Sequence, residues 1–121
     1  MHKTWLPWLM VFVVLACARP VEAPLTLPVA AEPSAKMHND QGIAYFKAGR
    51  YYDALIKFTQ AAVADSTSGE IHFNIGLAYY QRGEKDKALE HFRLARKYAD
   101  GNPALTQSDF LSRQLGPVGS P

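Results

Sequence analysis

Two stretches of sequence decide the fold: residues 42–61, GIAYFKAGRYYDALIKFTQA, and residues 76–95, GLAYYQRGEKDKALEHFRLA. The same residue types recur in them 34 positions apart. The matched pairs are Gly42 and Gly76, Ala44 and Ala78, Tyr45 and Tyr79, Gly49 and Gly83, Ala54 and Ala88, Leu55 and Leu89, Phe58 and Phe92, and Ala61 and Ala95. A period of this length indicates a helix-turn-helix repeat. Within each copy the small and aromatic residues recur at helical spacing. The sequence therefore predicts an all-α body made of two copies of one helical hairpin.

The pattern resembles the tetratricopeptide repeat (TPR). In that family a Gly-x-x-Tyr pair lies on the first helix of each repeat and an Ala-x-x-x-Phe-x-x-Ala set lies on the second. The resemblance covers residues 35–100 and implies one repeat at 35–68 and a second at 69–102. Small residues let two helices approach closely, and aromatic rings fill the space between layers. The residues expected to pack the repeats are Gly42, Tyr45, Ala54, Phe58, Ala61, Gly76, Tyr79, Ala88, Phe92 and Ala95.

A further helix is predicted after the second repeat. Gly101 and Asn102 are residues that end a helix, and Pro103 is well suited to the first turn of a new one. The apolar residues of the new helix are Leu105, Phe110, Leu111 and Leu115. Their spacing places them on one face. We expect a helix over 103–116 that caps the second repeat, followed by a disordered tail at 117–121.

The first residues have the pattern of an export signal. A positive tip precedes an apolar run that is too short to span a membrane as a helix. The tetrapeptide VLAC, which ends at Cys17, resembles the bacterial lipobox. This resemblance predicts a signal peptide at 1–16 and a Cys17 that carries fatty acids such as palmitate. Ala18 follows the cysteine, where an inner-membrane retention signal would have Asp, so the resemblance implies the outer membrane. The alternative is cleavage at the small-x-small triplet around Cys17, which would release a soluble exported protein.

Proline recurs between this leader and the repeats. Pro20, Pro24, Pro28 and Pro33 exclude a continuous helix or central strand from residues 17–34. We expect a flexible to semi-rigid tether there. At about 3.1 Å per residue it would hold the body up to roughly 50 Å from the lipid. Plain disorder without a selected length is the alternative.

By resemblance to the TPR family, the first helices of the repeats line a concave groove in which peptides dock. The corresponding residues are Asn39, Ile43, Phe46, Lys47, Phe73, Leu77, Tyr80 and Gln81. Their apolar and aromatic character predicts an apolar or amphipathic ligand, with a helix laid into the groove. Phe73, Leu77 and Tyr80 are the expected anchors. The alternative is that this surface is core, covered by another part of the chain or by a second copy.

The sequence offers little catalytic or metal chemistry. It contains no nucleophile elbow, phosphate-binding glycine loop or His-Glu-x-x-His motif, so no enzyme activity, cofactor or small-molecule substrate is predicted. His38 and His72 share a repeat position but lack the further ligands of a structural zinc site, and we expect them to pack. The net charge of +2 does not indicate a nucleic-acid partner. Arg93, Arg96 and Lys97 form a basic stripe that the helix dipole explains, with a membrane or acidic-partner surface as the alternative.

These features predict a non-enzymatic protein-protein interaction module. We expect a lipid-anchored TPR adaptor in the bacterial cell envelope, held at the outer membrane and facing the periplasm. Two repeats are fewer than the three that usually give independent stability. A self-associating structural subunit of an envelope assembly is therefore the first alternative. A soluble exported TPR protein is the second.

Overall fold

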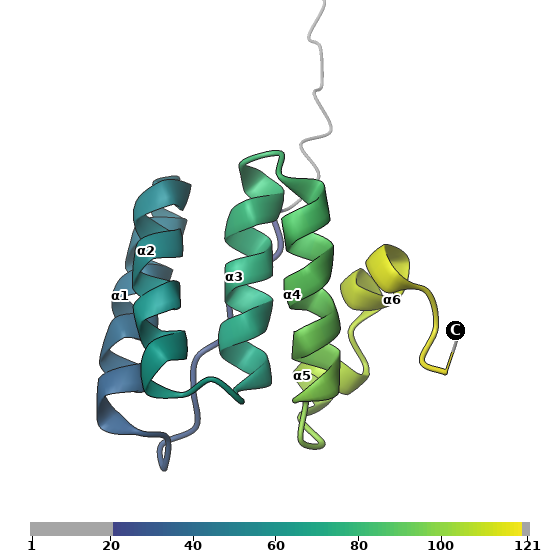
Figure 1. The fold of residues 1–121 in the computed structure, drawn as a ribbon, viewed down its shortest axis with the longest axis horizontal. Coiled ribbons are helices and arrows are strands. Elements are labelled where there is room, and N and C mark those ends of the chain that lie inside the picture. The colour runs from purple at the N-terminus through teal and green to yellow at the C-terminus, as the bar shows by residue number, and fades with distance from the viewer. Residues whose placement is uncertain (1–20, 120–121) are drawn as a thin grey trace, which may run out of the picture.

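The computed structural model describes residues 21–119, and within them the chain is helical with no strand. The helices are α1 (Pro33–Lys47), α2 (Tyr51–Ala64), α3 (Gly69–Gln81), α4 (Lys85–Lys97), α5 (Pro103–Thr106) and α6 (Asp109–Leu115). Helices α1 and α2 form one hairpin and α3 and α4 a second, and the two stand side by side (Figure 1). The predicted all-α fold of two helical hairpins is confirmed.

Local chemistry sets the bounds of these helices. The Glu32 side chain accepts a hydrogen bond from the Ala35 amide, and Pro33 occupies the first helical position of α1. Ser68 caps α3 in the same way through the Ile71 amide. Gly49 and Gly83, at equivalent repeat positions, have φ of 74° and 77° after the first helix of each hairpin. Only glycine takes this conformation without strain, so each first helix ends there.

Each hairpin is held together by a glycine that lies directly under an aromatic ring. A Cβ atom added to Gly42 would lie 2.5 Å from ring carbons of Phe58, and one added to Gly76 would lie 2.5 Å from ring carbons of Phe92. Both rings are fully buried. The small residues that complete this packing, also fully buried, are Ala54, Ala61, Ala88 and Ala95. The contact between helices is therefore too close for larger side chains.

The C-terminal part differs from the single capping helix predicted over 103–116. It contains two short helices, because the Ser108 hydroxyl accepts a hydrogen bond from the Leu111 amide and starts α6 as a separate helix. Phe110 of α6 packs edge-on against Phe92 of α4 at a ring separation of 5.4 Å. Arg96 donates to the Gly116 carbonyl at 2.8 Å, so this member of the basic stripe holds the end of α6. Of the predicted tail, residues 117–119 form a bend and turn, and 120–121 lie outside the described residues.

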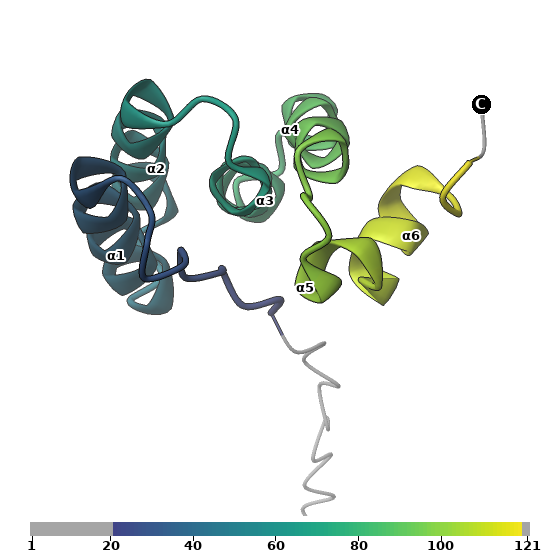
Figure 2. The same ribbon diagram turned by 90° about the horizontal axis from the view of Figure 1, so that it is seen from below.

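In its described residues, 21–32, the N-terminal segment packs against the helices, which differs from the flexible to semi-rigid tether predicted over 17–34. Helix α1 already begins at Pro33, and Leu27 is 6% exposed. Figure 2 shows the segment crossing the concave side of the helices, between α1 and α5 and beside α3. Proline excludes helix and strand from it but leaves an extended backbone, which a groove can accommodate. The predicted signal peptide at 1–16 and the predicted lipidation site Cys17 lie outside the described residues.

None of the helices in residues 21–119 combines the length and the apolar character that a membrane crossing requires.

Replacing Ala88 with Leu is expected to lower the free energy of unfolding by about 1–3 kcal/mol, because extra methylenes would enter the close contact between α3 and α4. The Ala88 side chain is fully buried, and its carbonyl oxygen is 3.2 Å from a Cβ built on Gly76. The matched control is Ala64→Leu at the exposed end of α2. Urea unfolding of both variants measures the difference. Equal midpoints would contradict this account of the packing.

Candidate functional site

The concave face formed by α1 and α3 is covered, and most of its predicted residues are buried. The buried members of the predicted set are Asn39, Ile43, Phe46, Phe73 and Leu77. Lys47 and Tyr80 are exposed, and Gln81 is half-buried. The prediction of an open groove that takes a partner helix is therefore corrected. The alternative, a surface covered by another part of the same chain, is what the structure contains.

The cover is held by two asparagines that bind the main chain of Leu25. Asn74 accepts a hydrogen bond from the Leu25 amide at 2.7 Å and donates to the Leu25 carbonyl at 2.8 Å. Asn39 donates to the same carbonyl at 3.0 Å and accepts from Asn74 at 2.8 Å. A carboxamide offers one donor and one acceptor side by side, as a peptide group does. The Asn74 side chain thus binds an extended backbone as a neighbouring strand would.

Leucine side chains anchor the segment on either side of an exposed residue. Leu27 is buried and Leu25 packs against the same core, whereas Thr26 between them is exposed. Alternate residues of an extended chain point to opposite sides, so a Leu-x-Leu pattern presents two side chains to one surface. Beyond Leu27 the chain turns, with the Ala31 amide bonded to the Pro28 carbonyl at 3.0 Å, and leads into α1.

Sequence reasoning placed Asn39 in the groove but missed Asn74. The two residues are 35 positions apart, one more than the repeat period, so the repeat alignment pairs Asn39 with Phe73 instead. Both asparagines are fully buried inside helices, where asparagine is a poor helix former. Two uncharged polar residues among the apolar residues of the first helices were the signal that could have identified the pair.

Phe73 is a core residue and not an anchor for a ligand. Its ring lies 5.9 Å from Phe92 and 6.1 Å from Phe110, inside an aromatic cluster between α3, α4 and α6. Tyr80 lies one helical turn beyond Leu77, 37% exposed, with its ring 5.6 Å from Phe110. Phe110 of α6 packs against Phe73 and Tyr80, and of the three predicted anchors only Tyr80 reaches the surface.

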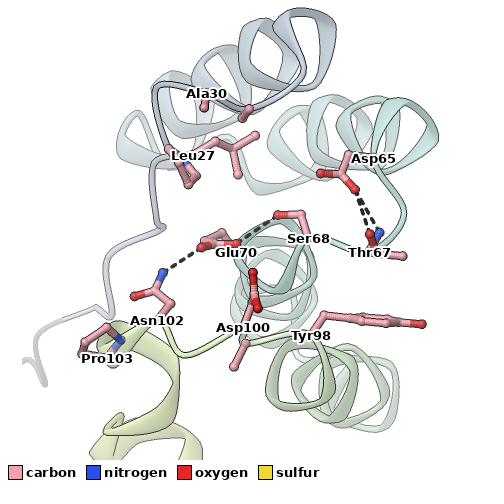
Figure 3. A pocket seen from close by; sticks show the side chains of 13 residues that line it. Leu27, Ala30, Asp65, Thr67, Ser68, Glu70, Tyr98, Asp100, Asn102 and Pro103 are labelled. Atoms are coloured by element: carbon pink, nitrogen blue, oxygen red, sulfur yellow. Dashed lines mark hydrogen bonds between the residues drawn. The ribbon is translucent and has the colours of Figure 1, made fainter.

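Two open cavities flank the bound segment. One of about 640 Å³ lies where the described chain begins, and it is lined by Val21, Glu22, Tyr80, Gln81, Phe110, Arg113 and Gln114. The other, of about 520 Å³, lies at the opposite end, beside Leu27 and Pro28 (Figure 3).

The carboxylates at the second cavity serve the loops around it. Glu70 accepts hydrogen bonds from Asn102 at 2.7 Å and from the Ser68 hydroxyl at 3.1 Å, and Asp65 accepts from Thr67 (Figure 3). The bond from Asn102 to Glu70 joins the loop before α5 to the start of α3, and the other two bonds lie within the loop before α3 and its first turn. They explain the polar residues of this cavity as structural contacts.

His72 of α3 and His91 of α4 form a pair that the repeat pattern does not predict. His72 Nδ1 lies 3.2 Å from His91 Nδ1, and His72 Nε2 lies 2.8 Å from the Ser66 carbonyl. The carbonyl can only accept, so Nε2 of His72 carries a proton and its Nδ1 accepts from His91. Among residues 21–119 no group of three or more His, Cys, Asp or Glu side chains is placed to hold a metal ion.

Burial, together with the neighbouring His72 ring, lowers the pKa of His91 below its ordinary value of 6.5, against a smaller opposing effect of Glu90. The folded protein therefore binds a proton at His91 less readily than the unfolded chain does. The contribution of neutral His91 to the free energy of unfolding is therefore fully present above pH 6.5. It is lost as the pH falls from there toward the lowered pKa.

Replacement of His91 by Gln is expected to flatten the decrease in unfolding free energy between pH 7 and pH 5, because glutamine donates to His72 without titrating. Urea unfolding at a series of pH values measures this slope. A variant slope as steep as that of the wild type would show that His91 does not contribute to acid sensitivity.

The fold agrees with what comparison with known proteins finds. A search of curated proteins finds no match to this chain. The family model described as "Tetratricopeptide repeat" matches residues 39–103, which is more than half of the chain. The match begins inside α1, at Asn39, and includes α2, α3, α4 and both asparagines. TPR repeats form a non-catalytic fold that mediates binding to other proteins. The chain therefore belongs to the tetratricopeptide repeat family and is a protein-interaction module.

Proposed function

We propose that this chain is a lipid-anchored adaptor of the bacterial cell envelope that binds another protein on its concave face. The observation that carries the proposal is the pair of buried asparagines bonded to the Leu25 main chain. Contacts of this kind depend on the backbone of the bound segment and on two leucines. A groove with these contacts is suited to an extended peptide of another protein.

The anchoring part of the proposal rests on the leader. A short apolar run ends in VLAC at Cys17, and Ala18 follows. These residues support lipidation at Cys17 and retention at the outer membrane on the periplasmic side. A soluble exported form remains the outcome if Cys17 carries no lipid.

Docking of the segment would shorten the tether that joins lipid and body. Leu25 is only eight positions after Cys17. A chain of that length spans at most about 28 Å, even when fully extended. While the segment occupies the groove, the repeats would stay close to the membrane surface. The expected distance of roughly 50 Å would require the segment to be released.

Partner contact is expected at the rim of the groove, where Tyr80 borders the open cavity of about 640 Å³. The exposed face of α2 is the second surface at which a partner contact is tested. Tyr52, Ile56 and Val63 lie along one exposed face of α2, and Val63 is 86% exposed. The self-assembly alternative predicts a second copy in the groove, and this face of α2 offers a second copy apolar contacts outside the groove.

Replacing Cys17 with Ser is expected to move the protein from the membrane to the soluble fraction while the helical body stays folded. The reason is that the predicted lipid attaches outside the repeats. Fractionation with radioactive palmitate labelling measures both effects. Absence of label in the wild-type protein would replace lipidation with soluble export.

A photo-reactive phenylalanine analogue at Tyr80 is expected to cross-link a partner of the full-length protein in the envelope, whereas the same group at Val63 gives several-fold less product. Mass spectrometry identifies the product. The reverse result, with a cross-link to a second copy at Val63, would contradict the adaptor and support self-assembly through α2.

A further inference from the structure

The segment of residues 24–28 makes the contacts of a bound peptide rather than those of a loop. Its one clamped residue, Leu25, uses both main-chain groups, and Leu27 is buried while Thr26 remains exposed. Pro24 and Pro28 flank the three residues. Prolines have no amide donor and favour an extended backbone, so Pro24 and Pro28 themselves add no donor that needs a partner in the groove.

Some of the contacts that shape the groove do not involve this segment. The bond from Asn74 to Asn39 joins the two side chains directly, at 2.8 Å. The close contacts inside each hairpin, Gly42 with Phe58 and Gly76 with Phe92, do not involve the segment. A preorganised pair of amides lowers the cost of binding a peptide there.

The groove chemistry also defines which peptide fits. The two side chains that contact the Leu25 main chain are neutral amides, and both are fully buried. A terminal carboxylate or amine would lose its water there without gaining an opposite charge. The ligand is thus an internal stretch of an extended chain, with leucine-sized residues two positions apart.

We propose that residues 24–28 are an intramolecular ligand of the concave groove, and that a partner binds by presenting an extended Leu-x-Leu segment that displaces them. The inference rests on the proposed function, since it assigns the ligand class of the proposed binding face. Displacement would free residues 25–32 and lengthen the tether by about 25 Å at polyproline spacing. Partner capture and distance from the membrane would then change together.

The turn before α1 allows a test in which every protein folds with its own segment in place. Val29 is 96% exposed, and Ala30 beside it is also exposed. A protease site inserted between them is cut after folding, which converts residues up to 29 into a separate, non-covalently held peptide. A fluorescent peptide of residues 21–31, VEAPLTLPVAA, is then added, and its anisotropy is measured.

We expect the labelled peptide to exchange into the cut protein and to bind at least tenfold more weakly to the uncut protein, where the attached segment competes. A peptide with Leu27→Asp is expected to lose at least tenfold in affinity. The matched control is Thr26→Ala, which changes the exposed residue between the leucines and should bind as the original does. Asn74→Ala in the cut protein is expected to lower its affinity for the labelled peptide at least tenfold as well.

Two outcomes would overturn the inference. In one, the cut segment stays bound and no labelled peptide enters. In the other, helical circular dichroism is lost when the segment leaves, which would make it part of the core. Peptide exchange combined with no partner cross-link at Tyr80 would support the intramolecular ligand while removing the support for the adaptor. The two proposals can therefore fail separately.

Discussion

The close approach of the two helices in each hairpin is the constraint on which the rest of the structure depends. Gly42 under Phe58 and Gly76 under Phe92 leave no room for even a methyl group. Both hairpins obey the same constraint, and they stand next to each other with α1 and α3 on one side (Figure 2). That common side is the concave face.

A concave face of this composition needs a cover. Its apolar residues favour burial, and its two asparagines would be costly to bury without partners. The main chain of Leu25 satisfies the asparagines, while Leu25 and Leu27 cover the apolar residues. One extended segment thus meets both requirements. The interactions that complete the fold are the same interactions that a peptide ligand would make.

The ends of the body supply what a third repeat would supply in a longer TPR array. A repeat is stabilised by the neighbours on both of its sides. On the C-terminal side, Phe110 of α6 inserts beside Phe92 and Phe73 and closes the second repeat. On the concave side, the N-terminal segment contacts both repeats through Asn39 and Asn74. The two repeats therefore form a closed unit together with α6 and the N-terminal segment.

The sequence by itself determined the repeats. The 34-residue period and the glycines at 49 and 83 specify helices and turns through local sterics, and such signals can be read without knowledge of the rest of the chain. The leader and Cys17 lie outside the described residues and stay predictions.

Only the tertiary structure decided what covers the groove. An extended, proline-flanked segment has no periodic pattern, so nothing in residues 24–28 indicates that they bind a surface 49 positions away in the chain. The meeting of Asn39 with Asn74 and of His72 with His91 depends on how helices stack and not on repeat position. Phe73 became core for the same reason, since α6 packs over it. Contacts between distant segments arise from shape and from the need to satisfy buried polar groups, and these are properties of the folded chain as a whole.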